Sequence, residues 1–242
     1  TSKDKLPCCA RTLYNYVDKC LLTARNLDIL CRVRFKARYK HKARTASDAE
    51  FAMGRTYKDF KAYMEKNPDV PVCKMNTVDG RPGGKALLTL ILIRCNLMTA
   101  ILIERNTQDC VIEALDGLCT AMGTTPFRRL CGVILTDRGS EFRNTYGDEH
   151  DPNGKLRTHV FYCDPYYFWQ KGSMEKNHEF IHQILPKNPS FNWLTPSYVD
   201  RMGSHVNSYS RVQLNDKSPL EVAEFLTEKQ LFADLQQKLI HQ

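Results

Sequence analysis

The pattern of hydrophobic positions changes near residue 70. Before that point it is helical: apolar side chains recur on one helix face over residues 11–22, and a second short helix is predicted at Tyr57–Lys66, before Pro68. After it, apolar residues come in short runs separated by turn residues, which is typical of strands. Three such runs joined by short turns predict an antiparallel meander: Val70–Val78, Ala86–Ile93 and Leu97–Ile103.

The segment after the meander alternates between helix and strand. Asn106-Thr107 caps a predicted helix whose apolar face runs from Val111 to Met122 and which Gly123 ends. The later predicted elements are a buried strand at 133–135, a loop at 143–158, a strand at His159–Cys163, and helices at 170–185, 195–208 and 218–240. This order predicts an α/β fold of the ribonuclease-H-like type, a mixed sheet flanked by helices. We divide the chain into a small helical segment at 1–30, a connector at 31–69 and an α/β core at 70–242.

The composition is that of a globular protein, with 42% hydrophobic and 26% charged side chains among 242 residues. The longest apolar stretch, Ala86–Ile93, falls far short of the ~20 residues that a bilayer requires, so no membrane partner is expected. The chain opens with Thr-Ser-Lys-Asp, without an initiator Met or an apolar signal core. These features predict a cytosolic protein or a truncated fragment of one, and we favour the fragment.

The excess positive charge of +8 lies before residue 71, where 16 Lys/Arg face 8 Asp/Glu, whereas the rest of the chain has 19 of each. Basic residues occupy every second position of a segment that we call the basic arm: Arg32, Arg34, Lys36, Arg38, Lys40, Lys42 and Arg44. In an extended chain these charges can follow a phosphate backbone, and the interleaved Phe35 and Tyr39 favour a nucleic-acid partner. A solvated tail and contact with an acidic membrane surface are the alternatives.

The ten cysteines do not have the spacing of a zinc knuckle. Five of them lie in or beside apolar segments, where a free thiol behaves as a small hydrophobe: Cys73, Cys95, Cys110, Cys119 and Cys131. We therefore expect reduced core thiols rather than disulfides.

Two polar motifs follow apolar segments of the core. Asp137 ends a strand within Leu-Thr-Asp-Arg-Gly-Ser-Glu-Phe, and Glu175 lies in a predicted helix within Gln-Lys-Gly-Ser-Met-Glu-Lys-Asn-His. A strand that delivers a carboxylate into a glycine-containing turn is common in α/β active sites. Together with Asn-Thr-Val-Asp-Gly-Arg-Pro-Gly-Gly at 76–84 and Asn-Ser-Tyr-Ser-Arg at 207–211, these motifs resemble bacterial insertion-sequence transposases of the DDE class, which are similar to retroviral integrases. The likeness extends over nearly the whole chain.

The resemblance implies a polynucleotidyl transferase that binds transposon ends and target DNA, and that cleaves and transfers strands with two Mg²⁺ or Mn²⁺ ions ~3.5–4 Å apart. The ligands would be a strand-borne Asp, Asp137 and Glu175, because hard dications prefer charged oxygen atoms. It also implies that residues 1–30 are a helix-turn-helix remnant, and that the protein forms homo-oligomers on DNA in the bacterial cytoplasm, at the nucleoid. Contacts with DNA phosphates are assigned to the basic arm and to Lys171, Asn177 and His178.

The first ligand position departs from the family pattern. Where the family has Asp, this sequence has Asn76, whose neutral amide offers one carbonyl oxygen and cannot bridge two cations. Asp79 is the nearest substitute, but three residues along a strand place it ~10 Å away on the opposite face. Lys74 and Arg138 depart from the pattern as well. We expect little or no strand cleavage from a degenerating or engineered chain, and a gain of metal binding in Asn76→Asp. The alternative to an active enzyme is an inactive, transposase-derived DNA-binding protein.

The predicted helix that contains Glu175 also contains a possible zinc-binding motif, which favours a different function. The run from His178 to His182 fits the His-Glu-x-x-His pattern, in which two histidines one turn apart bind zinc and the Glu acts as a base. The pattern needs a helix that continues past the second His and a third ligand, yet Pro186 follows four residues after His182. A zinc metallopeptidase is therefore the distant alternative.

Overall fold

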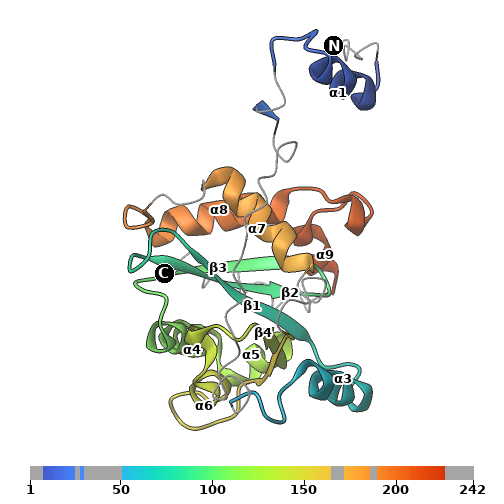
Figure 1. Ribbon diagram of the computed structural model, residues 1–242. Helices are drawn as coiled ribbons and strands as arrows, with labels where there is room; N and C mark the ends of the chain where they lie inside the picture. The colour runs from blue at the N-terminus through green and yellow to red at the C-terminus, as the bar shows by residue number, and fades with distance from the viewer. Residues whose placement is uncertain (1–7, 25–27, 30–50, 165–171, 186–189, 227–242) are drawn as a thin grey trace. The chain divides into compact units, whose positions relative to one another are not determined.

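The computed structural model describes residues 8–24, 28–29, 51–164, 172–185 and 190–226 (Figure 1). The chain divides into two compact units between Arg44 and Thr45. In the first unit, α1 (Ala10–Asp18) agrees with the helix predicted over 11–22 and buries Val17. The basic arm lies outside the described residues.

The second unit is built on a five-stranded sheet with the order β3-β2-β1-β4-β5. The first three strands form the predicted antiparallel meander: β1 (Val72–Asp79), β2 (Ala86–Leu92) and β3 (Leu97–Ile103). On the other side of β1, β4 (Val133–Thr136) runs parallel to it, and β5 (His159–Tyr162) runs parallel to β4. Three antiparallel strands continued by two parallel ones confirm the predicted ribonuclease-H-like fold.

Helices cover both faces of the sheet (Figure 1). On one face lie α4 (Gln108–Met122), α5 (Thr124–Leu130) and α6 (Thr145–Glu149); on the other lie α7 (Gly172–Ile184) and α8 (Pro196–Ser208), and α9 (Pro219–Leu226) follows near the chain end. Side chains of β1 alternate between the two layers, so Met75 packs in the core of the α4 side and Val78 in that of the α7 side. Among the described helices, none has the length and apolar character needed to cross a membrane.

The predicted loop at 143–158 contains a short helix, α6, which the polar composition did not indicate. The side chain of Asn144 begins it by accepting a hydrogen bond from the Gly147 backbone N–H at 3.1 Å. Asp148 and Glu149 of this helix are buried. Tertiary contacts rather than hydrophobic periodicity therefore order this segment.

The α3 helix (Tyr57–Lys66) belongs to the core unit, so the boundary predicted at 69/70 moves to 44/45. A capping box between Thr56 and Asp59 begins the helix. Its aromatic residues Tyr57, Phe60 and Tyr63 pack against the outer strands β4 and β5. Their spacing of three residues was the available signal for this partly buried helix face.

Cys73 and Cys131 form a disulfide with their Cα atoms 5.3 Å apart. The expectation of reduced thiols is therefore wrong for this pair. The cause is topological: β1 and β4 are parallel neighbours, with Val72 opposite Val133, and this pairing brings together cysteines that are 58 residues apart in the chain. Cys95 and Cys119 are free and buried, as predicted, and burial raises the pKa of both thiols.

Candidate functional site

Asn76 and Asp137 lie at matching positions on neighbouring parallel strands. The last paired residues of β1 and β4 are Lys74 and Leu135. Asn76 lies two residues after Lys74, and Asp137 lies two residues after Leu135. Side chains two residues apart share a face, and partners in register lie on the same face of a sheet about 4.8 Å apart. The strand geometry therefore brings these two positions together at the carboxyl ends of β1 and β4.

The turn after β4 fixes the carboxylate of Asp137. Thr136 is fully buried, and its hydroxyl donates to the Met75 carbonyl at 2.9 Å, which holds the end of β4 against β1. The next residue, Asp137, accepts a hydrogen bond from the Gly139 backbone N–H through Oδ1 at 2.8 Å. This Asx turn orients a half-buried carboxylate at the strand end.

The α7 helix lies over the face of the sheet that carries Asn76. Thr89, the β2 residue opposite Asn76, donates its hydroxyl hydrogen to the Asn76 carbonyl at 3.0 Å. Nε2 of His178 lies 3.2 Å from the same hydroxyl oxygen. Because the hydroxyl has one hydrogen and gives it to Asn76, Nε2 of His178 is the donor in the second bond. His178 therefore fastens α7 to the strand pair that holds Asn76.

Glu175 lies in α7 three residues before His178, which is about one helical turn. In the chain, Glu175 is therefore close to His178, the α7 residue that contacts the strands β1 and β2 at Asn76 and Thr89. Its side chain lies outside the described part of the structure.

The predicted DNA contacts near Glu175 have different outcomes. Asn177 is completely buried, so a direct contact with DNA is not expected from it, and its place is in the packing of α7. His178 is partly exposed, and its Nε2 atom forms a hydrogen bond with the Thr89 hydroxyl. Lys171 and the seven basic residues of the arm lie outside the described residues.

The two histidines of the His-Glu-x-x-His run do not act together. His178 binds Thr89 on the sheet, whereas Nδ1 of His182 lies 3.3 Å from the Leu185 carbonyl of its own helix end. In the described part of the chain, no group of three His, Cys, Asp or Glu side chains is placed to hold a metal ion. The geometry gives no support to the zinc peptidase alternative.

A second polar cluster lies on the opposite face, towards α4. Nδ2 of Asn106 donates to Oδ2 of Asp79 at 3.2 Å, and the Thr77 hydroxyl donates to Oε1 of Glu141 at 2.8 Å. Thr77 and Asp79 alternate with Asn76 along β1, so Asp79 cannot replace it at the candidate site.

Positive charge accompanies the candidate site. Lys74 is only 9% exposed and shares the face of Asn76, two residues away. Arg138 directly follows Asp137, and its Nη2 atom lies 3.8 Å from Oδ1 of Asp164 beyond the end of β5. From the sequence, Lys74 was noted only as a departure from the family pattern, although its spacing of two from Asn76 was a signal that both residues lie on one strand face.

The described donor set does not fit two divalent cations. Two closely spaced dications repel each other and need several anionic oxygen ligands. Among the described side chains on this face of β1 and β4, Asp137 supplies one carboxylate and Asn76 a neutral amide, whereas Lys74 adds a positive charge.

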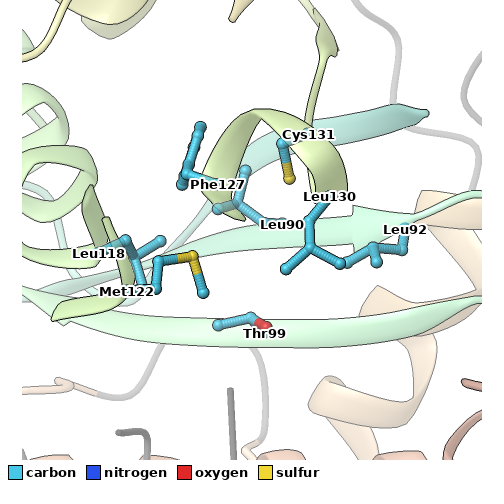
Figure 2. A pocket seen from close by; sticks show the side chains of 8 residues that line it. All are labelled: Leu90, Leu92, Thr99, Leu118, Met122, Phe127, Leu130 and Cys131. Atoms are coloured by element: carbon cyan, nitrogen blue, oxygen red, sulfur yellow. The ribbon is translucent and has the colours of Figure 1, made fainter. Parts of the chain in front are cut away.

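An apolar pocket lies elsewhere, between the sheet and helices α4 and α5 (Figure 2). Figure 2 shows aliphatic, aromatic and sulfur-containing side chains around it, with Thr99 as its polar member: Leu90, Leu92, Thr99, Leu118, Met122, Phe127, Leu130 and Cys131. Its β2 residues belong to the α4 side of the sheet, opposite to Asn76. The pocket is a packing gap in that core and has no part in the candidate site.

Comparisons with known proteins bear on the identity of this site. No protein-family model matches the chain. Among curated proteins it is similar to the transposase of IS4351 from Bacteroides fragilis, with 27% identity over 94 residues, 39% of this chain and 28% of that protein. The transposase of IS1086 from Cupriavidus metallidurans is 33% identical over 126 residues, 50% of this chain and 37% of that protein. Transposase InsI of IS30A from Escherichia coli is 32% identical over 65 residues, 27% of this chain and 17% of that protein.

The chain thus matches at most 37% of the length of these three relatives. A solved intasome of simian T-cell lymphotropic virus, in complex with the PP2A regulatory subunit B56 gamma, aligns with a TM-score of 0.45 and 13% identity, over 62% of this chain and 53% of that chain. The curated relatives confirm the resemblance to insertion-sequence transposases.

Proposed function

We propose that this chain, which is similar in sequence to insertion-sequence transposases, is the core of a transposase that binds transposon-end DNA and has little or no strand-cleavage activity. The observation that carries the proposal is the placement of Asn76 and Asp137 at matching ends of parallel strands, on the face over which α7 lies. These are the positions where the resemblance puts the first two catalytic carboxylates. One of them is an amide.

The loss of cleavage follows from the charge of the site. Strand cleavage with two ions needs carboxylates that offset the repulsion between the ions. Asn76 contributes no negative charge, and Lys74 adds a positive one on the same strand face. Binding of DNA does not need the missing carboxylate, because most of the affinity for DNA comes from contacts with phosphates.

Binding and cleavage can be separated on one DNA. The probe is a duplex taken from the DNA that flanks the coding sequence, with a scrambled duplex of equal length as control. We expect a mobility shift that is stronger for the flanking sequence, and no nicking of a supercoiled plasmid carrying it in Mg²⁺ or Mn²⁺. Equal binding of both duplexes would contradict the recognition of transposon ends. Light scattering with and without the probe tests the proposed homo-oligomer on DNA.

An active enzyme is the second candidate, because Asp137 and Glu175 are both present and α7 carries Glu175 next to the Asn76 strand pair. Robust nicking by the native chain that disappears in Asp137→Asn would establish this candidate. It would also show that Asn76 does not limit the reaction.

A further inference from the structure

We propose that Arg211 and Lys217, which follow α8 in the chain, form a binding site for a phosphate group of the DNA backbone. These residues lie outside the candidate site at Asn76 and Asp137. The proposal rests on the proposed function, because the phosphate belongs to the DNA that the chain binds. The observation that carries it is an arginine that the fold buries without an anion.

The guanidinium group of Arg211 is largely unpaired. The residue is only 8% exposed, and of its five N–H donors one, at Nη2, donates to the Val206 carbonyl at 3.2 Å. Nε is buried without a partner, and among the described residues no carboxylate pairs with the group. Burial lowers the pKa of this guanidinium group. The folded chain therefore bears the cost of a desolvated cation without an anion that offsets it.

A second buried arginine, Arg157, shows how this chain balances such a charge elsewhere. Arg157 is completely buried, and its guanidinium group donates to the Asp116 carboxylate and to two backbone carbonyls. Arg211 instead lies over the Phe180 ring of α7, 5.1 Å from the ring centroid, which is attractive but supplies no negative charge. The anion that would balance Arg211 is thus not supplied by the described residues.

Lys217 brings a second cation to the same place. It is the antiparallel bridge partner of Arg211, whose backbone N–H donates to the Lys217 carbonyl at 3.0 Å. Side chains directly opposite each other lie on the same face with Cβ atoms about 5 Å apart, where like charges repel. Lys217 is exposed, and Nη1 of Arg211 also has no partner but, unlike Nε, is not sealed from solvent. An anion that arrives from solvent can therefore meet both cations.

The surroundings favour phosphate as that anion. The planar fork of a guanidinium group matches two phosphate oxygens. The three residues before Arg211 are exposed and carry hydroxyl groups: Ser208, Tyr209 and Ser210. Arg, Lys, Ser and Tyr are among the side chains that contact DNA phosphates. The Tyr209 ring packs against Phe180 with the centroids 5.3 Å apart, so the hydroxyl-bearing segment and the guanidinium group share one neighbour.

The salt dependence of DNA binding gives the first test. Each phosphate contact contributes about −0.9 to the slope of log K against log salt concentration. On a random-sequence duplex, Arg211→Met and Lys217→Gln should each reduce the magnitude of the slope by about 0.9. Lys155→Gln, which removes an exposed lysine charge in the loop after α6, is the matched control and should leave the slope unchanged. An unchanged slope in either Arg211→Met or Lys217→Gln would overturn the proposal.

Thermal melting without DNA separates a binding residue from a structural one. Met replaces the guanidinium group with an apolar chain, so Arg211→Met should not lower the Tm in KCl. In inorganic phosphate at equal ionic strength, the Tm of the native chain should rise by about 2 °C more than that of Arg211→Met. The variant measures the general stabilisation that phosphate gives to proteins. An equal response to phosphate, or a fall of several degrees in KCl, would contradict the assignment.

A carboxylate of a second copy of the chain is the other anion to test. If it occupied the site, Arg211→Met would abolish self-association in light scattering and leave the slope on DNA unchanged, which would overturn the proposal. Lys217→Gln keeps the slope test decisive if Arg211→Met does not fold, because the Lys217 side chain is exposed. The melting test contains no DNA and the slope is measured on random-sequence DNA, so a failure of transposon-end recognition would leave both results unaffected.

Discussion

Asp148 shows how strongly its surroundings can alter one side chain. It is completely buried, and neither of its carboxylate oxygens has a hydrogen-bond partner in the structure. Burial raises the pKa of this carboxyl to about 7, although the positive charge of Arg157 acts in the opposite direction. Desolvation therefore outweighs the nearby guanidinium group, and the carboxyl is neutral in mildly acidic solution.

Because the pKa of Asp148 is raised in the folded chain, we expect the free energy of unfolding to fall as the pH rises through the acid range. The folded-state pKa of about 7 lies above the ordinary value of 3.8, so between these values the folded chain holds a proton that the unfolded chain has released. In that window the free energy of unfolding should fall by up to about 1.4 kcal/mol per pH unit. Urea denaturation at pH 4.5, 5.5 and 6.5 measures this slope, and Asp148→Asn should flatten it.

The matched control for this slope is Asp151→Asn. The hydroxyl of Thr124 donates to Asp151 and lowers the pKa of its carboxyl. Its stabilising effect is present above the unfolded-state pKa and is lost only as the pH falls through the lower folded-state value. Asp151→Asn should therefore leave the slope between pH 4.5 and 6.5 unchanged. An equal slope in the native chain and in Asp148→Asn would show that Asp148 does not take up the proton.

At the scale of elements, Arg157 explains how a polar segment becomes part of the core. Its side chain is completely buried and donates to Oδ1 of Asp116 on α4 at 2.5 Å, to the Gly147 carbonyl at 2.6 Å and to the Asp148 carbonyl at 2.9 Å. These bonds tie α6 and the start of β5 to α4. The sequence predicted a loop here because its residues are polar and the partner on α4 is 41 positions away in the chain.

The disulfide between β1 and the segment before β4 should stabilise the arrangement of these elements. A cross-link that spans 58 residues restricts the unfolded chain, and its reduction should lower the free energy of unfolding by about 4 kcal/mol. Urea denaturation with and without a phosphine reductant measures the difference. The variant with both Cys73 and Cys131 replaced by Ala is the control, because the reductant should not change its midpoint. A native midpoint that does not respond to reductant would contradict a role of this bond in stability.

At the scale of the whole molecule, local patterns predicted the fold well because each element carried its own signal. The meander followed from short apolar runs, and the helix after it from the cap at Thr107, which accepts a hydrogen bond from the Cys110 backbone N–H. The position of Asp137 directly after a buried strand followed in the same way, because the apolar run Val133–Leu135 marks that strand, whereas the role of Asp137 in a site stays a prediction. The pairing of Cys73 with Cys131 and the burial of Lys74 depend on which strands are neighbours, and no local pattern contains that information.

The basic arm holds seven of the 16 Lys/Arg residues before position 71. If the arm supplies sequence-independent affinity for DNA, each contact with a phosphate releases a counterion and contributes about −0.9 to the slope of log K against log salt concentration. Replacing all seven basic residues with Gln should reduce the magnitude of the slope by as much as about six, and by less where some do not meet phosphates.

Filter binding of a random-sequence duplex between 50 and 300 mM KCl measures the slope, and the matched control replaces the exposed α3 lysines Lys58, Lys61 and Lys66 with Gln. The control shows how much of any change comes from the loss of positive charge elsewhere on the protein. An unchanged slope in the seven-Gln variant would leave the arm as a solvated tail. Loss of binding to anionic lipid vesicles in that variant, with an unchanged slope on DNA, would instead assign the arm to a membrane surface. A smaller slope on DNA, together with retained preference for the flanking sequence, would separate the electrostatic affinity of the arm from the recognition of transposon ends.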